Sequence, residues 1–253
     1  MTEELKVKGK EIVVPGEILA SGMGYLPSQG SYREGDNIIA SRLGMVNVDG
    51  KVIKIIPMSG RYHPRSGDVI IGRVTDVLFS GWRLETNTAY QAMLSMKDGS
   101  SDYISKGADL TKYHDVGDYT VAKIVNVTSQ NLIDLTMRGP GLKKLIGGRV
   151  IGVNTHKVPR IIGKQGSMIS MIKSTTGCRI VVGQNGLVWL DGEPKSELIA
   201  INTIRKIEAE AHISGLTDRI KVYLEKETGK KVEATAQPAA ATQTEAPASV
   251  KGE

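Results

Sequence analysis

Residues 161–166, Ile161-Ile162-Gly163-Lys164-Gln165-Gly166, decide how the second half of this chain folds. A strand pattern at 149–153 and a short helical turn at 158–162 precede this stretch. A helix pattern follows it, so the glycines stand between two helices. The elements expected after that helix are two strands, a long helix and a short helix: residues 179–182, residues 187–191, a helix from about Pro194, and a helix capped by Thr217. The sequence therefore predicts a βααββα domain followed by one extra helix.

The helix after the glycine stretch is indicated by its apolar spacing. Met168, Ile169, Met171 and Ile172 recur at the repeat that places residues on one helical face. Gly177 is positioned to end this helix, since glycine readily adopts the left-handed conformation of a C-cap.

The two glycines give the loop a chemistry of its own. Gly163 and Gly166 lack a Cβ atom, so the loop can approach a phosphate closely, and the next helix offers free N–H groups at the positive end of its dipole. An ordinary turn between helices is the alternative for such a pair of glycines taken alone. The residues expected to contact a phosphate backbone are Gly163, Lys164, Gln165 and Gly166, with Arg160 and Lys173 flanking them.

Positive charge is concentrated around this loop. The chain has 33 basic and 27 acidic residues, a formal net charge of +6. Residues 135–190 contain no Asp or Glu, which makes the remainder of the chain net negative. Such a segment indicates a module that faces a polyanion, and a solvated basic face without a partner is the alternative. The basic residues of the segment are Arg138, Lys143, Lys144, Arg149, Lys157, Arg160, Lys164, Lys173 and Arg179.

A series of β patterns precedes this domain. Five strands are what an OB-type barrel needs, and the polar insertion at 97–114 falls where such barrels accept a loop or a helix. The strands are expected at residues 69–74, 81–84, 90–94, 119–125 and 132–137.

Residues 68–74 and 79–82 resemble the first two strands of an S-one RNA-binding domain, and this resemblance implies a binding face on the barrel. Phe79 and Trp82 are candidate platforms for base stacking, a contact typically worth about 1–3 kcal/mol per base. Trp82 can equally fill the barrel core, and that alternative stays open. Arg73 and Arg83 are candidates for contacts with phosphates.

The first sixty or so residues predict a small all-β unit. Short β-branched runs alternate with Gly and Pro, and Asp49-Gly50 is typical of a two-residue hairpin turn. Turn-forming residues cluster at 63–67, and the last stretch of Ala, Thr, Gln and Pro has little that could pack. We therefore expect a multidomain α+β protein with these parts: an N-terminal β domain at 1–64, an OB-type barrel at 65–138, a βααββα domain with its C-terminal helix at 145–228, and a disordered tail at 229–253.

Composition excludes several classes of protein. Hydrophobic residues make up 40% of the 253, enough for a buried core, which excludes wholesale disorder. The one cysteine, Cys178, can form neither an internal disulfide nor a zinc ribbon, and it is expected to enter a strand as a small hydrophobic residue. No apolar run approaches the length of a membrane span, and the N-terminus lacks a signal-peptide core. We expect a cytoplasmic protein without membrane contact.

The sequence contains no recognisable catalytic constellation. His63, His114, His156 and His212 lie on different predicted elements, without a partner at metal-ligand or catalytic-triad spacing. The carboxylate pairs of the polar loops are typical of residues that cap turns. We therefore expect no catalytic residue, no metal ion and no cofactor.

Two parts of the chain resemble known RNA-binding domains. The glycine loop in its βααββα order resembles a KH domain, whose Gly-x-x-Gly loop clamps the nucleotide backbone. Residues 68–74, followed by Phe79-Ser80-Gly81-Trp82, resemble the first strand and the aromatic second strand of an S-one RNA-binding domain. Many such domains have a surface His on the third strand, where this chain has Leu94-Ser95, so its stacking face lacks that residue.

The order of the parts resembles one family. Together with an N-terminal β unit beginning Val13-Val14-Pro15-Gly16-Glu17, the S-one and KH parts resemble the cap subunit of the archaeal RNA exosome, of the ribosomal-RNA-processing-protein-four type. The resemblance covers about residues 8 to 228 and includes the joint 62–69 and the late segment 214–220.

The resemblance implies a non-catalytic RNA-binding subunit. Such a subunit captures RNA, with some preference for adenine-rich RNA, and feeds it to a hexameric ring of RNase-PH-like subunits for phosphorolytic 3′-to-5′ degradation. It implies a trimeric cap, alone or mixed with a sister subunit that carries a zinc ribbon. The N-terminal domains of the cap anchor to the ring.

Two alternatives stay open. A transcription elongation factor of the antitermination kind also joins an S-one barrel to KH domains, although it has a KH pair, and a free-standing RNA chaperone would bind RNA without a ring.

Overall fold

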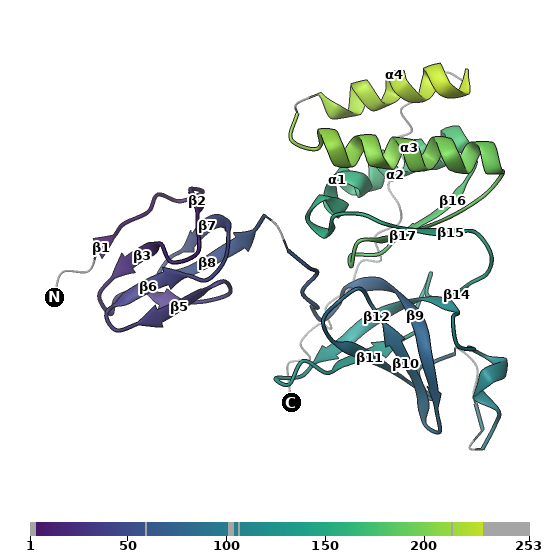
Figure 1. Ribbon diagram of the computed structural model, residues 1–253, viewed down its shortest axis with the longest axis horizontal. Coiled ribbons are helices and arrows are strands. Elements are labelled where there is room, and N and C mark those ends of the chain that lie inside the picture. The colour runs from purple at the N-terminus through teal and green to yellow at the C-terminus, as the bar shows by residue number, and fades with distance from the viewer. Residues whose placement is uncertain (1–3, 59, 101–103, 106, 214, 230–253) are drawn as a thin grey trace, which may run out of the picture. The chain divides into compact units, whose positions relative to one another are not determined.

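The computed structural model describes residues 4–58, 60–100, 104–105, 107–213 and 215–229 (Figure 1). It has two compact units: residues up to Pro64 with Asn87–Ala89, and Arg65–Thr86 with the chain from Tyr90 onward. The predicted α+β class is confirmed, with an all-β N-terminal part, a five-stranded barrel and a βααββα part. Except for Gly229, the tail predicted to be disordered lies outside the described residues.

The N-terminal unit consists of two small sheets, ordered β1-β3-β6-β5 and β2-β7-β8-β4. Val46 and Ile55 pair across β7 and β8 and point into the core, as expected for alternating strands with one buried face. The hairpin predicted at Asp49-Gly50 is confirmed. The strands are β1 (Glu4–Leu5), β2 (Ile12–Val13), β3 (Ile18–Ser21), β4 (Leu26–Pro27), β5 (Ser31–Glu34), β6 (Asn37–Ala40), β7 (Gly44–Asp49) and β8 (Val52–Pro57).

The barrel begins the second unit. Its strand order is β13-β11-β10-β9-β12, and the pairing of β13 with β12 closes it, while the short β14 extends the edge of β12. The five predicted strands are confirmed. The predicted insertion contributes only the 3-10 helix η1 (Leu110–Lys112) among its described residues. The strands are β9 (Val69–Leu78), β10 (Gly81–Glu85), β11 (Gln91–Ser95), β12 (Tyr119–Val127), β13 (Ile133–Thr136) and β14 (Lys144–Leu145).

The insertion between β11 and β12 covers Trp82. The indole is fully buried, and its Nε1 donates a hydrogen bond of 2.9 Å to the backbone oxygen of His114. The imidazole of His114 meets the indole edge-on, with 5.0 Å between ring centroids, and Gly99 packs directly against the indole. Trp82 therefore offers no face to a base, and the prediction that it is a stacking platform is wrong. The alternative, that it fills the barrel core, is the observed one.

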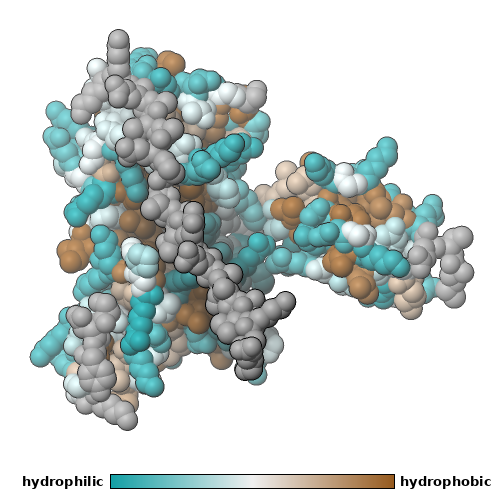
Figure 2. All heavy atoms as spheres, turned by 180° about the vertical axis from the view of Figure 1, so that it is seen from behind, coloured by the Kyte–Doolittle hydropathy of each residue, from teal (hydrophilic) through white to brown (hydrophobic). Residues whose placement is uncertain are grey.

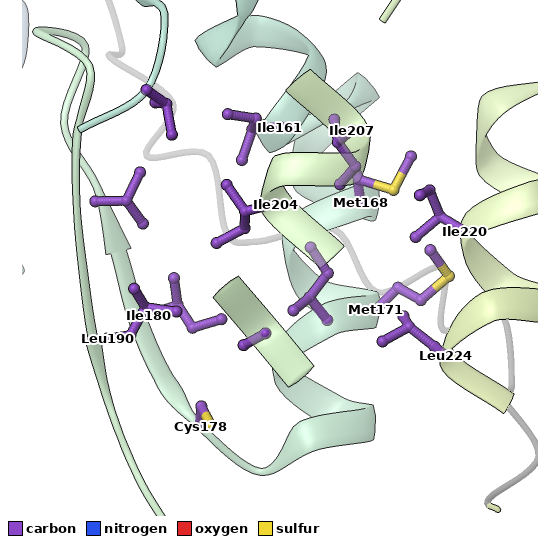
Figure 3. Packing of buried hydrophobic residues seen from close by; sticks show 14 of the residues in the cluster. Ile161, Met168, Met171, Cys178, Ile180, Leu190, Ile204, Ile207, Ile220 and Leu224 are labelled. Carbon is purple, nitrogen blue, oxygen red and sulfur yellow. The ribbon is translucent and has the colours of Figure 1, made fainter. Parts of the chain in front are cut away.

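The KH-like part has a three-stranded antiparallel sheet, ordered β15-β17-β16, with helices on one face (Figure 1). Ile180 and Leu190 of the sheet meet Ile161, Met168 and Ile204 of the helices in a buried core (Figure 3). The elements are β15 (Arg149–Gly152), η2 (Thr155–Lys157), α1 (Val158–Ile162), η3 (Lys164–Gly166), α2 (Ser167–Thr176), β16 (Arg179–Val182), β17 (Leu187–Asp191), α3 (Pro194–Glu210) and α4 (Leu216–Thr228).

Details of this part follow the sequence closely. Gly177 caps α2 with a positive φ of 71°, and its N–H donates to the carbonyl of Lys173. Cys178 is buried in the same core, as expected. One prediction is wrong: Thr217 does not cap α4, because that helix already begins at Leu216, with Gly215 at the N-cap.

The other face of the KH-like sheet packs against the barrel. Val150, Trp189 and Val181 lie side by side across the three strands, on the face opposite Leu190. They form one apolar cluster with barrel residues that include Ile71. The barrel therefore closes the sheet face that the helices leave open.

Asn185, in the turn between β16 and β17, ties the two parts together with its side-chain amide. The residue is fully buried, its Nδ2 donates to the carbonyl oxygens of Ile71 and Thr86 at 2.7 and 2.9 Å, and its Oδ1 accepts from the N–H of Ile71 at 3.3 Å. Strand β10 ends at Glu85, whose partner on β9 is Arg73, so Ile71 lies beyond the paired part of these strands. The amide there bonds both backbone groups of Ile71, as a neighbouring strand would.

Replacing Asn185 by Ala should lower the free energy of unfolding of the second unit by about 3 kcal/mol, since several buried backbone groups lose their partner. Urea unfolding measures this loss. The matched control is Gln184→Ala in the same turn, where the backbone hydrogen bond from Gln184 to Val69 remains. The Gln184→Ala substitution should lower the free energy of unfolding by less than about 1 kcal/mol. If the two variants lost the same free energy of unfolding, the side-chain amide of Asn185 would not be what holds the turn to the barrel.

The stability of the barrel should depend on pH through His114. Burial lowers the pKa of His114 below its usual value, because its side chain is enclosed by the insertion and the barrel. Below pH ~6.5 the unfolded chain takes up a proton that the folded chain refuses, so the free energy of unfolding falls as the pH falls toward the lowered pKa. Above pH ~6.5 both states are neutral at this residue and the contribution is constant.

Urea unfolding between pH 7.5 and 5 should therefore show a steeper loss for the native chain than for His114→Phe, by at most about 1.4 kcal/mol per pH unit. The remaining histidines are present in both proteins and cancel in the difference. If the free energy of unfolding of the two proteins changed with pH in the same way, His114 would not be the source of the pH dependence.

Candidate nucleic-acid interface

The glycine loop between α1 and α2 lies at the surface of the KH-like part. The side chains of Lys164 and Gln165 are exposed. Gly163, Gln165 and Gly166 have positive φ angles of 77°, 53° and 78°, which turn the chain sharply from one helix into the next. No side chain caps the N-terminus of α2 at Gly166. The loop therefore presents backbone, a mobile cation and the start of a helix to the same side, an arrangement suited to an anion.

The two glycines are required for different reasons. A Cβ atom on Gly163 would lie 2.6 Å from the Cβ and 2.7 Å from the backbone nitrogen of Met168, so no other residue fits there. A Cβ atom on Gly166 would meet nothing closer than the Ile169 side chain at 4.0 Å. Only its positive φ restricts Gly166, and Asn and Asp tolerate that conformation better than other residues do.

A groove of about 560 Å³ lies beside the loop. One wall comes from α1, the loop and the start of α2, and the other comes from Ile213, Gly215 and the first turn of α4. The first wall carries the cations of Arg160 and Lys164, and the second carries the carboxylate of Asp218. The lining residues are Pro159, Arg160, Gly163, Lys164, Ser167, Met168, Ile213, Gly215, Leu216, Thr217 and Asp218.

Lys173 lies apart from this groove. It is in the last turn of α2, seven residues after Gly166, which corresponds to about 10 Å along the helix axis. Partial desolvation lowers the pKa of its ammonium group. The structure thus brings Arg160, Gly163 and Lys164 to one groove, with Gln165 and Gly166 in the same loop, and leaves Lys173 two turns away.

The acid-free segment of sequence is not free of acids in space. Three of its cations meet carboxylates from outside the segment: Arg138 with Asp98, Lys144 with Asp118, and Arg179 with Asp191. Others have no carboxylate within ion-pair distance among the described residues: Lys143, Arg149, Lys157, Arg160, Lys164 and Lys173. The unpaired charge is therefore smaller than the sequence indicates, and two of these cations line the groove.

The barrel presents Phe79 as an exposed aromatic residue. Phe79 is 93% exposed at the tip of the hairpin between β9 and β10. Arg83 forms an ion pair with Asp76 at 3.6 Å, and Arg73 stands opposite Glu85 on the neighbouring strand. Arg83 is therefore partly neutralised by Asp76, whereas Arg73 makes no ion pair with a described residue. Phe79 stays a predicted stacking platform.

Sequence reasoning missed the second wall of the groove. Thr217 and Asp218 follow the loop glycines by some fifty residues, and only the packing of α4 against α2 and α3 brings them near. The pattern of α4 predicts a helix that packs back on the body, but nothing in that pattern tells where its first turn lies.

Two negative findings apply to the described residues. No group of three or more His, Cys, Asp or Glu among them could hold a metal ion. None of their helices combines the length and the apolar character that crossing a membrane requires.

Three family models match this chain in sequence order. Residues 12–49 match the N-terminal region of the exosome complex exonuclease RRP4, residues 61–103 match the RRP4 S1 domain, and residues 149–206 match the KH domain. The S1 match covers the first strands of the barrel, and the KH match ends within α3, before α4 begins.

Curated relatives match over most of the chain. Exosome complex component Rrp4 of Thermococcus kodakarensis is 43% identical over 226 residues, covering 88% of each chain. The protein of the same name from Picrophilus torridus is 43% identical over 220 residues, 87% of this chain and 94% of its own. A crystal structure of a protein described as an exosome complex RNA-binding protein is 35% identical, with a TM-score of 0.60, over 66% of this chain and 97% of its own. This chain belongs to the Rrp4 family of exosome complex components.

Proposed function

We propose that this chain is an RNA-binding cap subunit of an exosome, which captures RNA and passes it to a phosphorolytic ring of RNase-PH-like subunits. The observation that carries the proposal is the exposed glycine loop, with Lys164 and the uncapped start of α2 on one side of it. The order of the three matched domains and the names of the relatives support the same assignment. The relatives from Thermococcus kodakarensis and Picrophilus torridus are both named as exosome components, and neither name describes an elongation factor or a chaperone.

RNA is bound in this proposal by two surfaces. At the loop, backbone N–H groups, the helix dipole and Lys164 hold phosphates, with Arg160 beside them in the groove and Lys173 as a more distant cation. On the barrel, Phe79 stacks on a base and Arg73 contacts a phosphate, while Arg83 does so when the RNA strand displaces Asp76. Trp82 supports this surface from inside the barrel.

The N-terminal unit is proposed to anchor the chain to the ring. Ile12, Met45 and Ile56 lie in one row across β2, β7 and β8, because Met45 pairs with both other residues. Ile12 is 58% and Ile56 45% exposed, and Figure 2 shows hydrophobic groups at the surface of this unit. A contiguous exposed apolar face is typical of a protein interface. In the proposed cap, three copies take part, alone or with the sister zinc-ribbon subunit, and the RNase-PH-like subunits perform the chemistry.

The loop proposal is tested by a charge pair at Gly166. Gly166→Asp and Gly166→Asn have nearly the same shape, and both fit the open space and the positive φ there. The Asp variant places a negative charge beside the expected phosphate and should lower the affinity for single-stranded RNA at least about ten-fold, while the Asn variant should lose at most about three-fold. Fluorescence anisotropy of the full chain with a labelled RNA at one fixed low salt concentration measures both affinities.

Thermal unfolding of the two variants in the buffer used for the binding measurements is the control for folding. If both variants bind RNA as tightly as the native chain does, the loop does not contact the phosphate backbone.

The anchoring proposal is tested by Ile12→Asp. A charge within the apolar row should lower recovery of RNase-PH-like subunits with the tagged, nuclease-treated chain at least about ten-fold, because an unpaired carboxylate would be buried in the contact. RNA affinity should not change. The matched control is Tyr32→Asp, since Tyr32 is 44% exposed on β5 of the other sheet.

Unchanged recovery of the ring subunits with Ile12→Asp would place the anchor elsewhere.

The chain without ring subunits, incubated with RNA and phosphate, serves as the catalytic control. Shortening of the RNA in that control would contradict the non-catalytic role.

A further inference from the structure

The groove beside the glycine loop combines groups of opposite charge. Arg160 and Lys164 lie on one wall, and Asp218, the third residue of α4, lies on the other. The match to the KH domain ends at residue 206, so α4 adds this acidic wall to a domain that is otherwise complete. A groove that bound phosphate alone would be weakened by a carboxylate, because like charges repel.

A backbone clamp by itself does not distinguish RNA from DNA. In the proposed function the N–H groups and the cation of the loop contact phosphates, which the two nucleic acids share. The 2′-hydroxyl group is what separates them at a given site, and it can donate a hydrogen bond to an acceptor that the protein supplies. A carboxylate is the strongest such acceptor among the side chains.

Asp218 has the properties that this role needs. Its side chain is exposed toward solvent, and within the described part of the chain its carboxylate makes no ion pair or side-chain hydrogen bond. The neighbouring Arg219 instead pairs with Glu210 at 2.7 Å. Asp218 also stands in the first turn of α4, where a negative charge stabilises the helix. That effect on the helix would act on RNA and DNA binding alike, so the two roles can be separated.

We propose that Asp218 makes this groove selective for RNA over DNA by accepting a hydrogen bond from a ribose 2′-hydroxyl, while Lys164 and the glycine loop hold the adjacent phosphate. The proposal rests on the proposed function of the loop and names the feature of the nucleic acid that the groove recognises. In RNA the hydroxyl lies between the carboxylate and the phosphate and offsets their repulsion. In DNA the repulsion is uncompensated.

The test compares Asp218→Ala with the native full chain on three oligonucleotides of one sequence: all ribose, all deoxyribose and all 2′-O-methyl. Loss of the acceptor should lower the affinity for the ribose strand about five-fold. The affinity for the other two strands should not fall, since neither donates a hydrogen bond from the 2′ position. The ratio of RNA to DNA affinity therefore drops. Asp218→Asn keeps an oxygen acceptor and should retain more of that ratio than Asp218→Ala does.

Glu227→Ala is the matched control, because it removes an exposed carboxylate from the same helix without touching the groove. It should leave the RNA to DNA ratio unchanged. If Asp218→Ala lowers the affinity for all three strands equally, or changes none, the proposal is overturned. Gly166→Asp and Gly166→Asn, measured on the same RNA, separate failure of this proposal from failure of the proposed function. If Gly166→Asp weakens RNA binding but Asp218→Ala does not change the ratio of RNA to DNA affinity, the loop still binds RNA and only the role of Asp218 is overturned. If neither variant has its expected effect, both proposals are overturned.

Discussion

The buried amide of Asn185 is the contact around which the second unit is organised. Strand β9 continues past the end of β10, and without Asn185 the N–H and carbonyl of Ile71 would be buried with no partner on that side. One primary amide satisfies both groups and a carbonyl of Thr86 as well. Because this amide fixes the turn between β16 and β17, the outer face of the KH-like sheet is held against the barrel, where Trp189 and its neighbours exclude water. The helical side, with its glycine loop, is the side that remains open.

Local patterns were sufficient to predict the elements and their order. Helical spacing identified α2, the dipeptide Asp49-Gly50 identified a hairpin, and the glycine loop was placed between two helices as it stands. These features depend on residues within a few positions of one another, so a single sequence records them. The barrel was predicted in the same way, from five short runs and the turns between them.

What could not be predicted comes from contacts between distant segments. Trp82 has the position of a surface aromatic in its strand, yet a segment some thirty residues later folds over it and accepts its N–H. Part of the positive charge of residues 135–190 is neutralised in the same way, because Asp118 and Asp191 lie outside this segment in sequence and pair with Lys144 and Arg179 in space. The turn containing Asn185 resembles any glycine-rich turn, since a buried amide and an exposed one have the same sequence.

The shared cluster between barrel and KH-like sheet limits how these domains can be exchanged in evolution or by design. A KH domain taken from another protein would have to supply an amide at the position of Asn185 and an apolar sheet face, and a barrel separated from its partner would expose Ile71 and Val121 to water. Although each part belongs to a type of RNA-binding domain, in this chain the two share one apolar cluster and one buried amide. A working chimaera would have to transfer together the residues of the barrel and of the KH-like sheet that form this shared cluster.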